Sequence, residues 1–431
     1  MELQDIKLPA NWRGCALREA CLKTSLWSPE RERRESFTYV DVSAVSNERF
    51  CITEPQVVHC ANAPSRARKI IKAGDVIYAT VRPSLKRVAW IEPSFDEQIA
   101  STAFCVVRAN PKQAESKFLY YLLLTDEVNR KIVEHEHGAS YPAITDKDVL
   151  NQFILLPPLS EQRKIAAVLW KVQEAVQTEA AIVHNARALK KSLLRGLFMH
   201  GLRDEPRKET PYGEVPEKWD IQLLSECAHV QTGVAKGRSI DPSKVIDVPY
   251  LRVANVQAGH LDLSEIKNIQ IRRDELERYS LRKDDVVLTE GGDFDKLGRG
   301  FIWDGQIEPC VHQNHIFAVR PRRDRLSPNY FAYLIQSSYG RGYFLAVAHK
   351  TTNLACINTN KLKAFPVLIP PLADQEKIAG ILQTVDAKIA VHEAKQRALQ
   401  DLFKTLLHQL MTAQIRVNHL DIDTNDVEFS R

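Results

Sequence analysis

Two stretches of about forty residues are near copies of one another, and they constrain the fold of this chain more than any other feature. Residues 156–198 open on Leu-Pro-Pro-Leu, residues 369–411 open on Ile-Pro-Pro-Leu, and the two align without a gap. Proline cannot continue a helix, and after its Pro-Pro pair each stretch holds no proline and at most one glycine. Each is therefore predicted to be one continuous helix, roughly 60 Å long at 1.5 Å per residue.

Apolar residues recur along both stretches in alternating steps of four and three, which is the pattern of a coiled-coil seam. The positions that flank this seam are rich in Glu, Gln, Lys and Arg. Each long helix is therefore predicted to pair with the other. The principal seam positions are Ile165, Leu169, Val172, Val176, Glu179 and Leu193 in the first stretch and Ile378, Leu382, Val385, Ile389, His392 and Leu406 in the second.

Each predicted seam has a polar interruption near its midpoint, Glu179 in the first stretch and His392 in the second. Antiparallel helices would bring these midpoints together. We therefore predict that Glu179 and His392 lie close and fix the register, as a buried polar seam residue can. The alternative is two ordinary surface helices, each packed separately on its own domain.

The repeat extends beyond the helices, so the chain is one unit written twice. Short β-rich runs separated by turns recur in the same order in both halves. A helix rich in aromatic residues follows them, at 117–122 and at 329–334, and is expected to serve core packing. The matched runs are 39–45 with 250–256, 73–77 with 283–287, 104–108 with 316–320, and 153–156 with 365–368.

This order predicts an α+β fold with a pseudo-twofold internal repeat, in which two similar mixed α/β domains are separated by two long helices that form an antiparallel coiled coil. The interval between the halves is polar and contains proline, as a linker does, and the acidic tail is expected to be poorly ordered. The expected boundaries are 1–156 for the first domain, 157–198 for the first helix, 199–211 for the linker, 212–368 for the second domain, 369–412 for the second helix and 413–431 for the tail.

Composition narrows the class of protein. With 431 residues, 26% charged and 44% hydrophobic, the chain is expected to be a soluble globular protein of two or more domains. It has no apolar run long enough to span a membrane and no signal peptide at its start, so a cytoplasmic location is predicted. The eight cysteines form no CxxC pair and are interpreted as reduced thiols.

Metal-binding and catalytic patterns are missing. Cys310, His312 and His315 lie close in sequence but have no matching second pair, so they are interpreted as structural rather than as a zinc site. The sequence has no GxxxxGK[ST] loop, GxSxG elbow or HExxH helix. The Pro-Pro pairs lack the neighbours of an amino-methyltransferase motif, and no nuclease site is evident. The chain is therefore predicted to have no reaction centre of its own.

Polar loops suited to DNA follow the strands of both halves. The net charge of +5 permits a nucleic-acid partner without demanding one. Glycine lets a backbone approach a groove, and Arg or Lys can contact phosphates or guanine. The candidate DNA-binding residues are Arg66, Arg68, Lys69, Arg82, Ser84, Lys86, Arg87, Ser140 and Tyr141 in the first half and Lys236, Arg238, Gly291, Gly292, Lys296, Arg299, His312, Gln313, Asn314, Lys350, Thr351 and Thr352 in the second.

These features together resemble the specificity (S) subunit of type I restriction-modification systems. The resemblance covers nearly the whole chain. It rests mainly on the duplicated Leu/Ile-Pro-Pro-Leu-x-Glu/Asp-Gln-x-Lys-Ile-Ala helix starts at 156–166 and 369–379, and on the Gly-Glu-Val-Pro-Glu-Lys-Trp entry at 213–219. It implies that each mixed domain is a target recognition domain reading one half of a split, asymmetric DNA sequence, with the paired helices as spacer.

The resemblance also implies partners and cofactors. Two DNA-methyltransferase (modification) subunits would supply S-adenosylmethionine-dependent adenine methylation, and restriction/translocase subunits would supply ATP- and magnesium-dependent cleavage. This chain would then be non-catalytic, bind double-stranded DNA, carry no cofactor and have no membrane contact. Two alternatives are a two-module protein-binding scaffold joined by a coiled-coil rod, and a restriction enzyme fused to its recognition modules, which the missing catalytic motifs disfavour.

Overall fold

The computed structural model describes residues 9, 11–28, 34–138, 141–237, 240–294, 296–350 and 355–425. The chain divides into two compact units. Unit 1 comprises residues 1–180 and 394–431, and unit 2 comprises residues 181–393. Each unit therefore contains one mixed domain together with half of each long helix.

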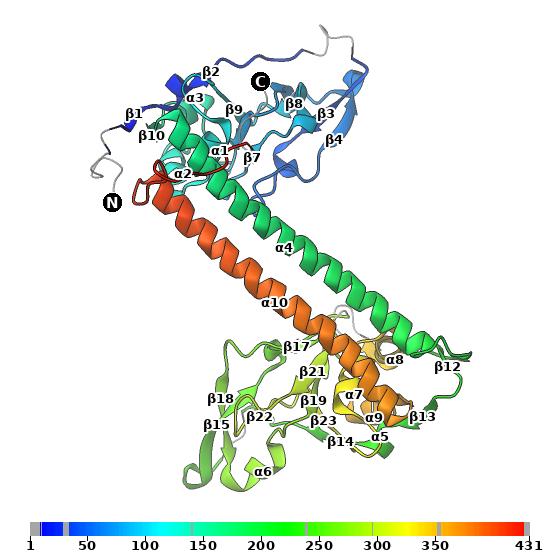
Figure 1. Cartoon of the computed structure of the whole chain (residues 1–431). Coiled ribbons are helices and arrows are strands. Elements are labelled where there is room, and N and C mark those ends of the chain that lie inside the picture. Colours follow the sequence, from blue (N-terminus) through cyan, green and yellow to red (C-terminus); the bar gives the residue numbers. More distant parts are fainter. Residues whose placement is uncertain are drawn as a thin grey trace. The chain divides into compact units, whose positions relative to one another are not determined.

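The long helices are α4 (Leu159–His200) and α10 (Leu372–Met411), and both are continuous (Figure 1). Each begins just after its Pro-Pro pair, because proline supplies no backbone N–H for a preceding turn. Glu161 and Asp374 lie in the two first turns, where a carboxylate is favoured by the helix dipole. The two continuous helices predicted from the repeat are confirmed.

The halves of the two helices pack antiparallel within each unit. In unit 1, Ile165 near the start of α4 shares a hydrophobic core with Leu410 near the end of α10. In unit 2, Phe198 near the end of α4 shares a core with Ile378 near the start of α10. Since the start of one helix meets the end of the other in both units, the predicted antiparallel pairing is confirmed, and separate surface helices are excluded.

All the principal seam positions are buried or half-buried, whereas large apolar residues off the seam, such as Leu189 and Val391, are exposed. Glu179 is only 4% exposed, and its Oε1 forms an ion pair with Lys395 Nζ at 2.6 Å within unit 1. His392 belongs to unit 2, so its approach to Glu179 stays a prediction.

The domain of unit 1 is built on two four-stranded sheets, with orders β2-β9-β6-β7 and β4-β3-β8-β5. Helix α1 packs against β6, β7 and β9. A separate pair, β1 (Arg13–Ala16) with β10 (Phe153–Leu156), leads into α4. The other elements are β2 (Cys21–Leu22), β3 (Ser36–Val40), β4 (Gln56–His59), β5 (Ala67–Ile71), β6 (Val76–Ala79), β7 (Val88–Trp90), β8 (Gln98–Ser101), β9 (Phe104–Ala109), α1 (Ser116–Leu124), α2 (Asp126–Val133) and α3 (Asp146–Leu150).

The domain of unit 2 repeats this plan with a four-stranded sheet β14-β23-β19-β21 and a three-stranded sheet β18-β15-β22. The pair β13 (Asp220–Leu223) with β26 (Pro366–Ile369) leads into α10, as β1 with β10 leads into α4. The main elements are α5 (Leu224–Cys227), β14 (Ala228–Thr232), β15 (Val245–Leu251), β18 (Lys267–Arg272), α6 (Leu276–Tyr279), β19 (Asp285–Thr289), β21 (Gly300–Trp303), β22 (Val311–His312), β23 (Ile316–Pro321), α7 (Pro328–Leu334), α8 (Ser338–Val347) and α9 (Thr359–Lys363).

The repeat is preserved down to single contacts. In each unit, a buried aspartate at the start of a central strand forms a bidentate ion pair with an arginine on the neighbouring strand. Arg108 donates to both carboxylate oxygens of Asp75 in unit 1, and Arg320 donates to both of Asp285 in unit 2, at 2.7–2.8 Å. Burial raises the pKa of Asp75, against the lowering effect of Arg108. The predicted pseudo-twofold repeat of two mixed domains is therefore confirmed.

A second shared contact joins each domain to its helix. The amide side chain of Gln162 at the start of α4 accepts from the Glu115 N–H and donates to the Gln113 carbonyl, and Gln375 at the start of α10 makes the same pair of contacts with Ser327 and Arg325. Both glutamines are fully buried. The Gln of each repeated helix start is thus the residue that fixes helix to domain.

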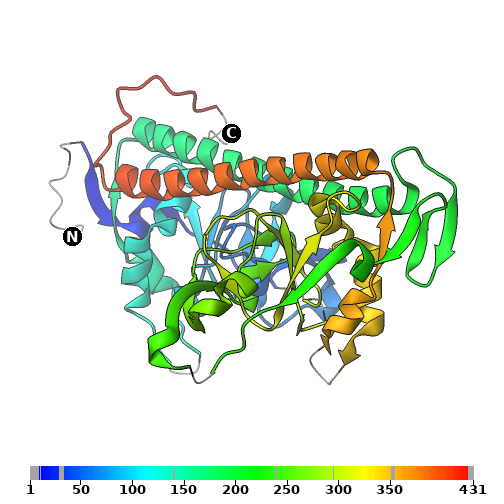
Figure 2. The same cartoon turned by 90° about the horizontal axis from the view of Figure 1, so that it is seen from below.

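The interval expected as a linker contains a hairpin. Strand β11 (Arg207–Thr210) pairs with β12 (Gly213–Pro216), and the hairpin follows the C-terminal end of α4 (Figure 2). Its tip residue Tyr212 packs edge-on against Tyr339 and Tyr343 of α8. Reading this polar, proline-bearing sequence as a plain linker therefore missed an ordered element held by aromatic contacts.

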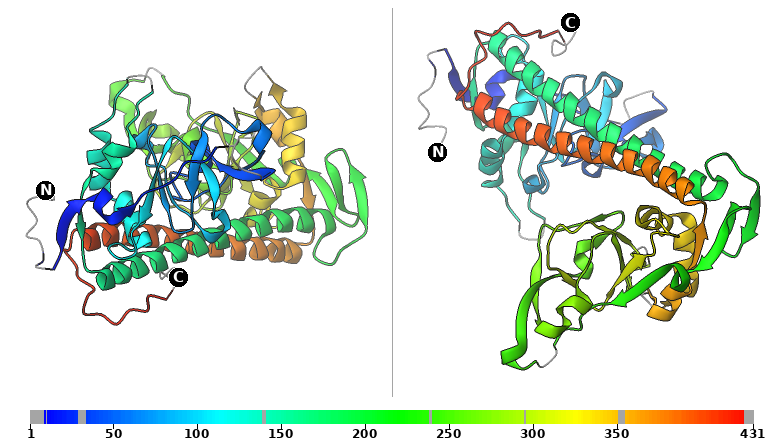
Figure 3. Two further views of the ribbon diagram at one scale, coloured as in Figure 1. Left: turned by 90° about the horizontal axis from the view of Figure 1, so that it is seen from above. Right: turned by 60° about the horizontal axis from the view of Figure 1, so that its bottom comes forward.

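The expectation of a poorly ordered tail is also corrected for its first part. After α10 the chain runs back beside the first turns of α4 (Figure 3). Val417 is buried in the core of unit 1, and Lys164 on α4 donates to the carbonyl oxygens of Asn418 and Leu420. Residues 426–431 lie outside the described part of the chain.

Candidate nucleic-acid interface

Three loops of unit 1 meet at Thr80, directly after strand β6. The Thr80 N–H donates to the Ala103 carbonyl oxygen at 2.8 Å, and the Thr80 carbonyl accepts from the Ile144 N–H at 2.8 Å. One residue thus joins the β6–β7 loop, the β8–β9 turn and the segment before α3. We call the described residues among 80–87, 102–103 and 136–144 the first loop junction.

Unit 2 has the same junction at Glu290, directly after strand β19. The Glu290 N–H donates to the His315 carbonyl oxygen at 2.9 Å, and the Glu290 carbonyl accepts from the Ile357 N–H at 2.9 Å. We call residues 290–294, 296–299, 313–315 and 355–357 the second loop junction. Because the backbone bonds are the same, the two junctions present different side chains from one shared frame.

Local sequence sets the shape of each junction. In the first, Arg82 and Lys86 adopt left-handed φ values of 47° and 52° on either side of a short 3₁₀ turn, Pro83–Leu85. In the second, Gly291 and Gly292 form strand β20, which pairs with β25 (Ala355–Cys356). A Cβ on Gly291 would lie 2.8 Å from the Ala355 carbonyl oxygen, so only glycine fits there.

Most of the basic residues predicted for the first half are used inside the protein. Lys69 pairs with Asp146, Lys86 pairs with Asp126 at 2.6 Å, and the Arg87 guanidinium donates to the carbonyl oxygens of Val42 and Val45. The guanidinium of Arg68 donates to the Ala67 carbonyl at 2.7 Å. These contacts tie the loops together and withdraw charge from the surface.

Arg66, Arg82, Ser84 and Tyr141 are the predicted residues of the first half that stay exposed. The Arg82 guanidinium lies 5.7 Å from the centre of the Tyr141 ring, a cation–π contact between two of the junction loops. Tyr141 is 79% exposed, so the ring presents an open face beside a positive charge. Ser140 lies outside the described residues.

In the second half, Lys236 is exposed, with its ammonium 5.4 Å from the centre of the Tyr250 ring. Gln313, Asn314 and Arg299 are half-buried at the junction, and Lys296 pairs with Asp293. Gly291 and Gly292 shape the loop as described above. The backbone of Lys350 pairs with Ala355, whereas Arg238, Thr351 and Thr352 lie outside the described residues.

His312 is fully buried and cannot reach a DNA molecule in this fold. It lies at the end of β22, which pairs in parallel with β15, and its ring Nδ1–H donates to the Ile316 carbonyl at 2.9 Å. Burial lowers its pKa to about 4, so the ring is neutral. The segment 310–315 resembles a strand, whereas its polar string His-Gln-Asn-His resembles an exposed loop. The structure places His312 in the strand.

The sequence did not single out the side-chain pair at the centre of the second junction. His315 Nδ1 lies 2.7 Å from Glu290 Oε2. Glu290 is not among the candidate DNA-binding residues, because a carboxylate repels phosphate, although it can accept a hydrogen bond from cytosine. The internal repeat could have identified Glu290, because Glu290 follows β19 as Thr80 follows the equivalent strand β6.

Among the described residues, no group of three His, Cys, Asp or Glu side chains is placed to hold a metal ion. Burial raises the pKa of the Cys310 thiol to about 12, as expected of an inert core cysteine. Within the same residues, no helix has the length and apolar character needed to cross a bilayer.

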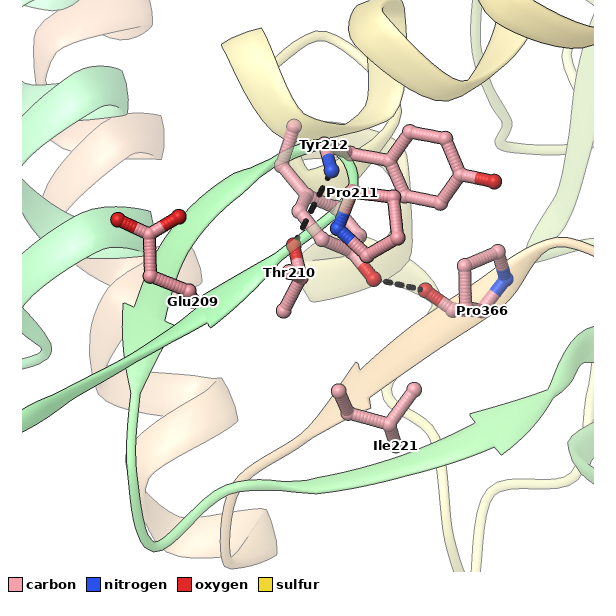
Figure 4. Close-up of a pocket in the computed structure, with 7 residues that line it drawn as sticks. Glu209, Thr210, Pro211, Tyr212, Ile221 and Pro366 are labelled. Atoms are coloured by element: carbon pink, nitrogen blue, oxygen red, sulfur yellow. Dashed lines mark hydrogen bonds between the residues drawn. The ribbon is translucent and has the colours of Figure 1, made fainter.

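One open pocket of about 410 Å³ lies on unit 2, beside the β11–β12 hairpin (Figure 4). It is lined by Glu209, Thr210, Pro211, Tyr212, Ile221, Tyr339 and Pro366. Two of these lining residues are joined by a hydrogen bond, since the Tyr339 hydroxyl donates to the Pro366 carbonyl at 2.9 Å. The Thr210 hydroxyl in its lining donates to the Gly213 carbonyl, and the pocket involves neither junction loop.

The sequence and fold of this chain are similar to those of known proteins. The family model described as the type I restriction modification DNA specificity domain matches residues 45–184 and 216–401, one match in each half of the repeat. The MjaVIII specificity subunit of a type I restriction enzyme from Methanocaldococcus jannaschii is 24% identical over 334 residues, which cover 75% of this chain and 76% of that protein. A further type I specificity subunit from the same archaeon is 24% identical over 218 residues, 50% of this chain and 51% of its own length.

A solved chain, described in a study of complex assembly and conformational transition of the type I R-M system, is 28% identical to this one. It aligns over 95% of this chain and 100% of its own length, with a TM-score of 0.57. The family model covers more than half of the chain and matches both mixed domains. The chain therefore belongs to the type I restriction-modification DNA specificity family.

Proposed function

We propose that this chain is the DNA-recognition subunit of a type I restriction-modification complex, and that each loop junction reads one half of a split target. The observation that carries this proposal is the pair of junctions. Both are built on the same backbone hydrogen bonds, around Thr80 and around Glu290, and they differ in every exposed side chain that we have described. Two junctions with the same backbone arrangement but different exposed side chains are suited to two different half-sites, so the DNA target is expected to be asymmetric.

Surface chemistry at the junctions fits a duplex. Arg82 in the first junction can contact phosphates, as can Arg66 and Lys236, which are exposed outside the junctions. Amide side chains such as Gln313 and Asn314 in the second junction can bond to base edges. The charges that are already paired, such as Lys86 with Asp126, are expected to add little. We therefore expect DNA binding to depend on a small number of exposed basic side chains, and the recognised DNA sequence to depend on the contacts with base edges.

The chemistry of the complex is assigned to other chains. Modification subunits would bring S-adenosylmethionine-dependent adenine methylation, and restriction/translocase subunits would bring ATP- and magnesium-dependent translocation and cleavage. This chain would bind none of these cofactors and would position the catalytic subunits on the DNA. The complex would work in the cytoplasm, on the chromosome and on incoming DNA.

The test is co-expression with a partner DNA methyltransferase subunit in a host free of adenine methylation. We expect the chains to copurify and host DNA to become methylated at one bipartite, non-palindromic motif, read by methylation-sensitive sequencing. Exchanging residues 220–365 for those of another family member is expected to change one half-site only. A complex that binds duplexes without regard to sequence would refute the proposal.

A further inference from the structure

The two loop junctions differ most at their central residue. In unit 1 this position is Thr80, which is 6% exposed, and its backbone partner Ala103 is 7% exposed. In unit 2 the same positions are Glu290 and His315, whose side chains are 29% and 57% exposed. The first junction is therefore closed at its centre, whereas the second presents an ionisable pair.

Glu290 is held firmly. Its N–H and its carbonyl are both used by neighbouring loops, as described above, so its backbone cannot shift without opening the junction. Among the described residues, the one side-chain hydrogen bond to its carboxylate comes from His315, whose Nδ1 lies 2.7 Å from Oε2. The backbone and the carboxylate end of Glu290 are thus both held, while 29% of the side chain stays exposed to solvent.

A fixed carboxylate in a DNA-facing loop is suited to one kind of contact. It repels phosphate, so it gains nothing from the backbone, but it accepts a hydrogen bond from an exocyclic amino group. In the major groove the pairing that geometry favours for Glu is the N4 amino group of cytosine. We propose that Glu290, positioned by His315, reads a cytosine N4 amino group in the half-site recognised by unit 2.

The surroundings support this assignment. Gly291 and Gly292 follow Glu290 directly and leave it without a neighbouring side chain on that flank. On the other loop, the Gln313 N–H donates to the Leu251 carbonyl and the Asn314 N–H donates to the Val234 carbonyl, both at 2.9 Å. The backbone that carries two amide side chains is therefore anchored next to His315, so these side chains can contact adjacent bases.

His315 is a positioning residue in this account, because it acts through Glu290 rather than on the base. Holding a glutamate rotamer in advance avoids a loss of side-chain entropy when the complex forms. Its removal should therefore weaken recognition while leaving the recognised base unchanged. The inference rests on the proposed function, since it names one contact within the proposed DNA interface.

The first experiment uses the wild-type complex, so folding is not at issue. Once the motif is known, each cytosine of the second half-site is replaced in turn by a pyrimidine that lacks the N4 amino group. One replacement is expected to slow methylation about tenfold to a hundredfold, the discrimination of a good base contact, and the others far less. If no cytosine responds, or if only an adenine amino group is needed, the inference is wrong.

The second experiment uses variants in the same complex. Glu290→Gln is expected to relax or change the motif at that single cytosine, with the first half-site intact. His315→Ala, which places the unit 1 residue at this position, is expected to lower the methylation rate at an unchanged motif, and His315→Asn to restore part of it. Glu277→Gln, the same change at an exposed glutamate of α6 in unit 2 that lies outside both loop junctions, is the matched control and should leave both half-sites unchanged.

The outcomes separate the two proposals. A wild-type complex without any sequence motif refutes the proposed function. A wild-type bipartite motif that Glu290→Gln leaves unaltered refutes only the role of Glu290.

Discussion

Replacing Arg416 by Met is expected to destabilise unit 1 strongly. The Arg416 guanidinium donates to both carboxylate oxygens of Glu161, at 2.6 and 2.7 Å, and to Asn11 at 3.0 Å. Glu161 is 1% exposed in the first turn of α4, and its one other side-chain donor among the described residues is the Trp12 indole N–H at 3.2 Å. The substitution would leave a buried carboxylate with a single side-chain hydrogen bond.

The size of the effect follows from the burial of Glu161. Removing one partner of a buried pair costs about 3–5 kcal/mol. The Arg416 side chain is 25% exposed, so solvent screens part of the ion pair. The dipole at the start of α4 also stabilises the Glu161 carboxylate and offsets up to about 1 kcal/mol of the cost of losing Arg416. We therefore expect a loss of about 2–3 kcal/mol, because part of the interaction is screened. For a unit of this size that corresponds to a fall in the melting temperature of roughly 4–12 °C.

Unit 2 supplies the matched control. Arg203 lies in the equivalent place after α4, 3.8 Å from Asp374 in the first turn of α10, but its side chain is 69% exposed. Arg203→Met should cost less than about 1 kcal/mol. Combining Arg416→Met with Glu161→Gln should recover much of the loss, since the buried charge is gone. Thermal unfolding followed by circular dichroism, with hydrogen exchange of the α4 first turn, measures all four proteins. Equal losses for Arg416→Met and Arg203→Met would refute the reasoning.

Three further predictions concern pH, phosphate contacts and the helices. His312 has a pKa of about 4 when folded and about 6.5 when unfolded. The unfolded chain therefore binds the proton first, and stability should fall from pH 6.5 towards pH 4; His312→Leu should flatten this slope in urea unfolding. Arg82→Gln should weaken DNA binding and reduce the slope of log binding constant against log salt concentration by about 1. Lys86→Gln loses a charge that is already paired with Asp126, so it should leave that slope unchanged. Fluorescence titrations at several salt concentrations measure both variants. Deleting one heptad from both α4 and α10, about 10 Å of helix, should alter the spacer of the methylated motif and neither half-site.

The long helices and the domain repeat could be predicted from the sequence because their signals are local. A Pro-Pro pair, an unbroken apolar period and a gapless second copy need no tertiary information. The β-rich runs predicted at 39–45 and 250–256 are largely wrong as strands: only their first two residues belong to β3 and β15, because residues 42–44 and 253–255 form 3₁₀ turns.

The use made of each basic residue could not be predicted. Lys69 and Lys86 find their aspartates 77 and 40 residues away in sequence, so no spacing rule identifies them as paired. His312 reads as a loop residue because its parallel pairing with Leu251 depends on a distant strand. Tyr212 orders the hairpin through contacts with α8, which the composition of the interval does not reveal.

The division of the chain into units has a consequence for how the protein is made. Unit 2 is one uninterrupted segment, residues 181–393, whereas unit 1 needs residues 394–425 to cover α4 and to neutralise Glu161. On the ribosome, the domain that emerges first therefore keeps part of the apolar α4 face and the Glu161 carboxylate uncovered until residues 394–425 have been made. The second domain can finish folding before the first.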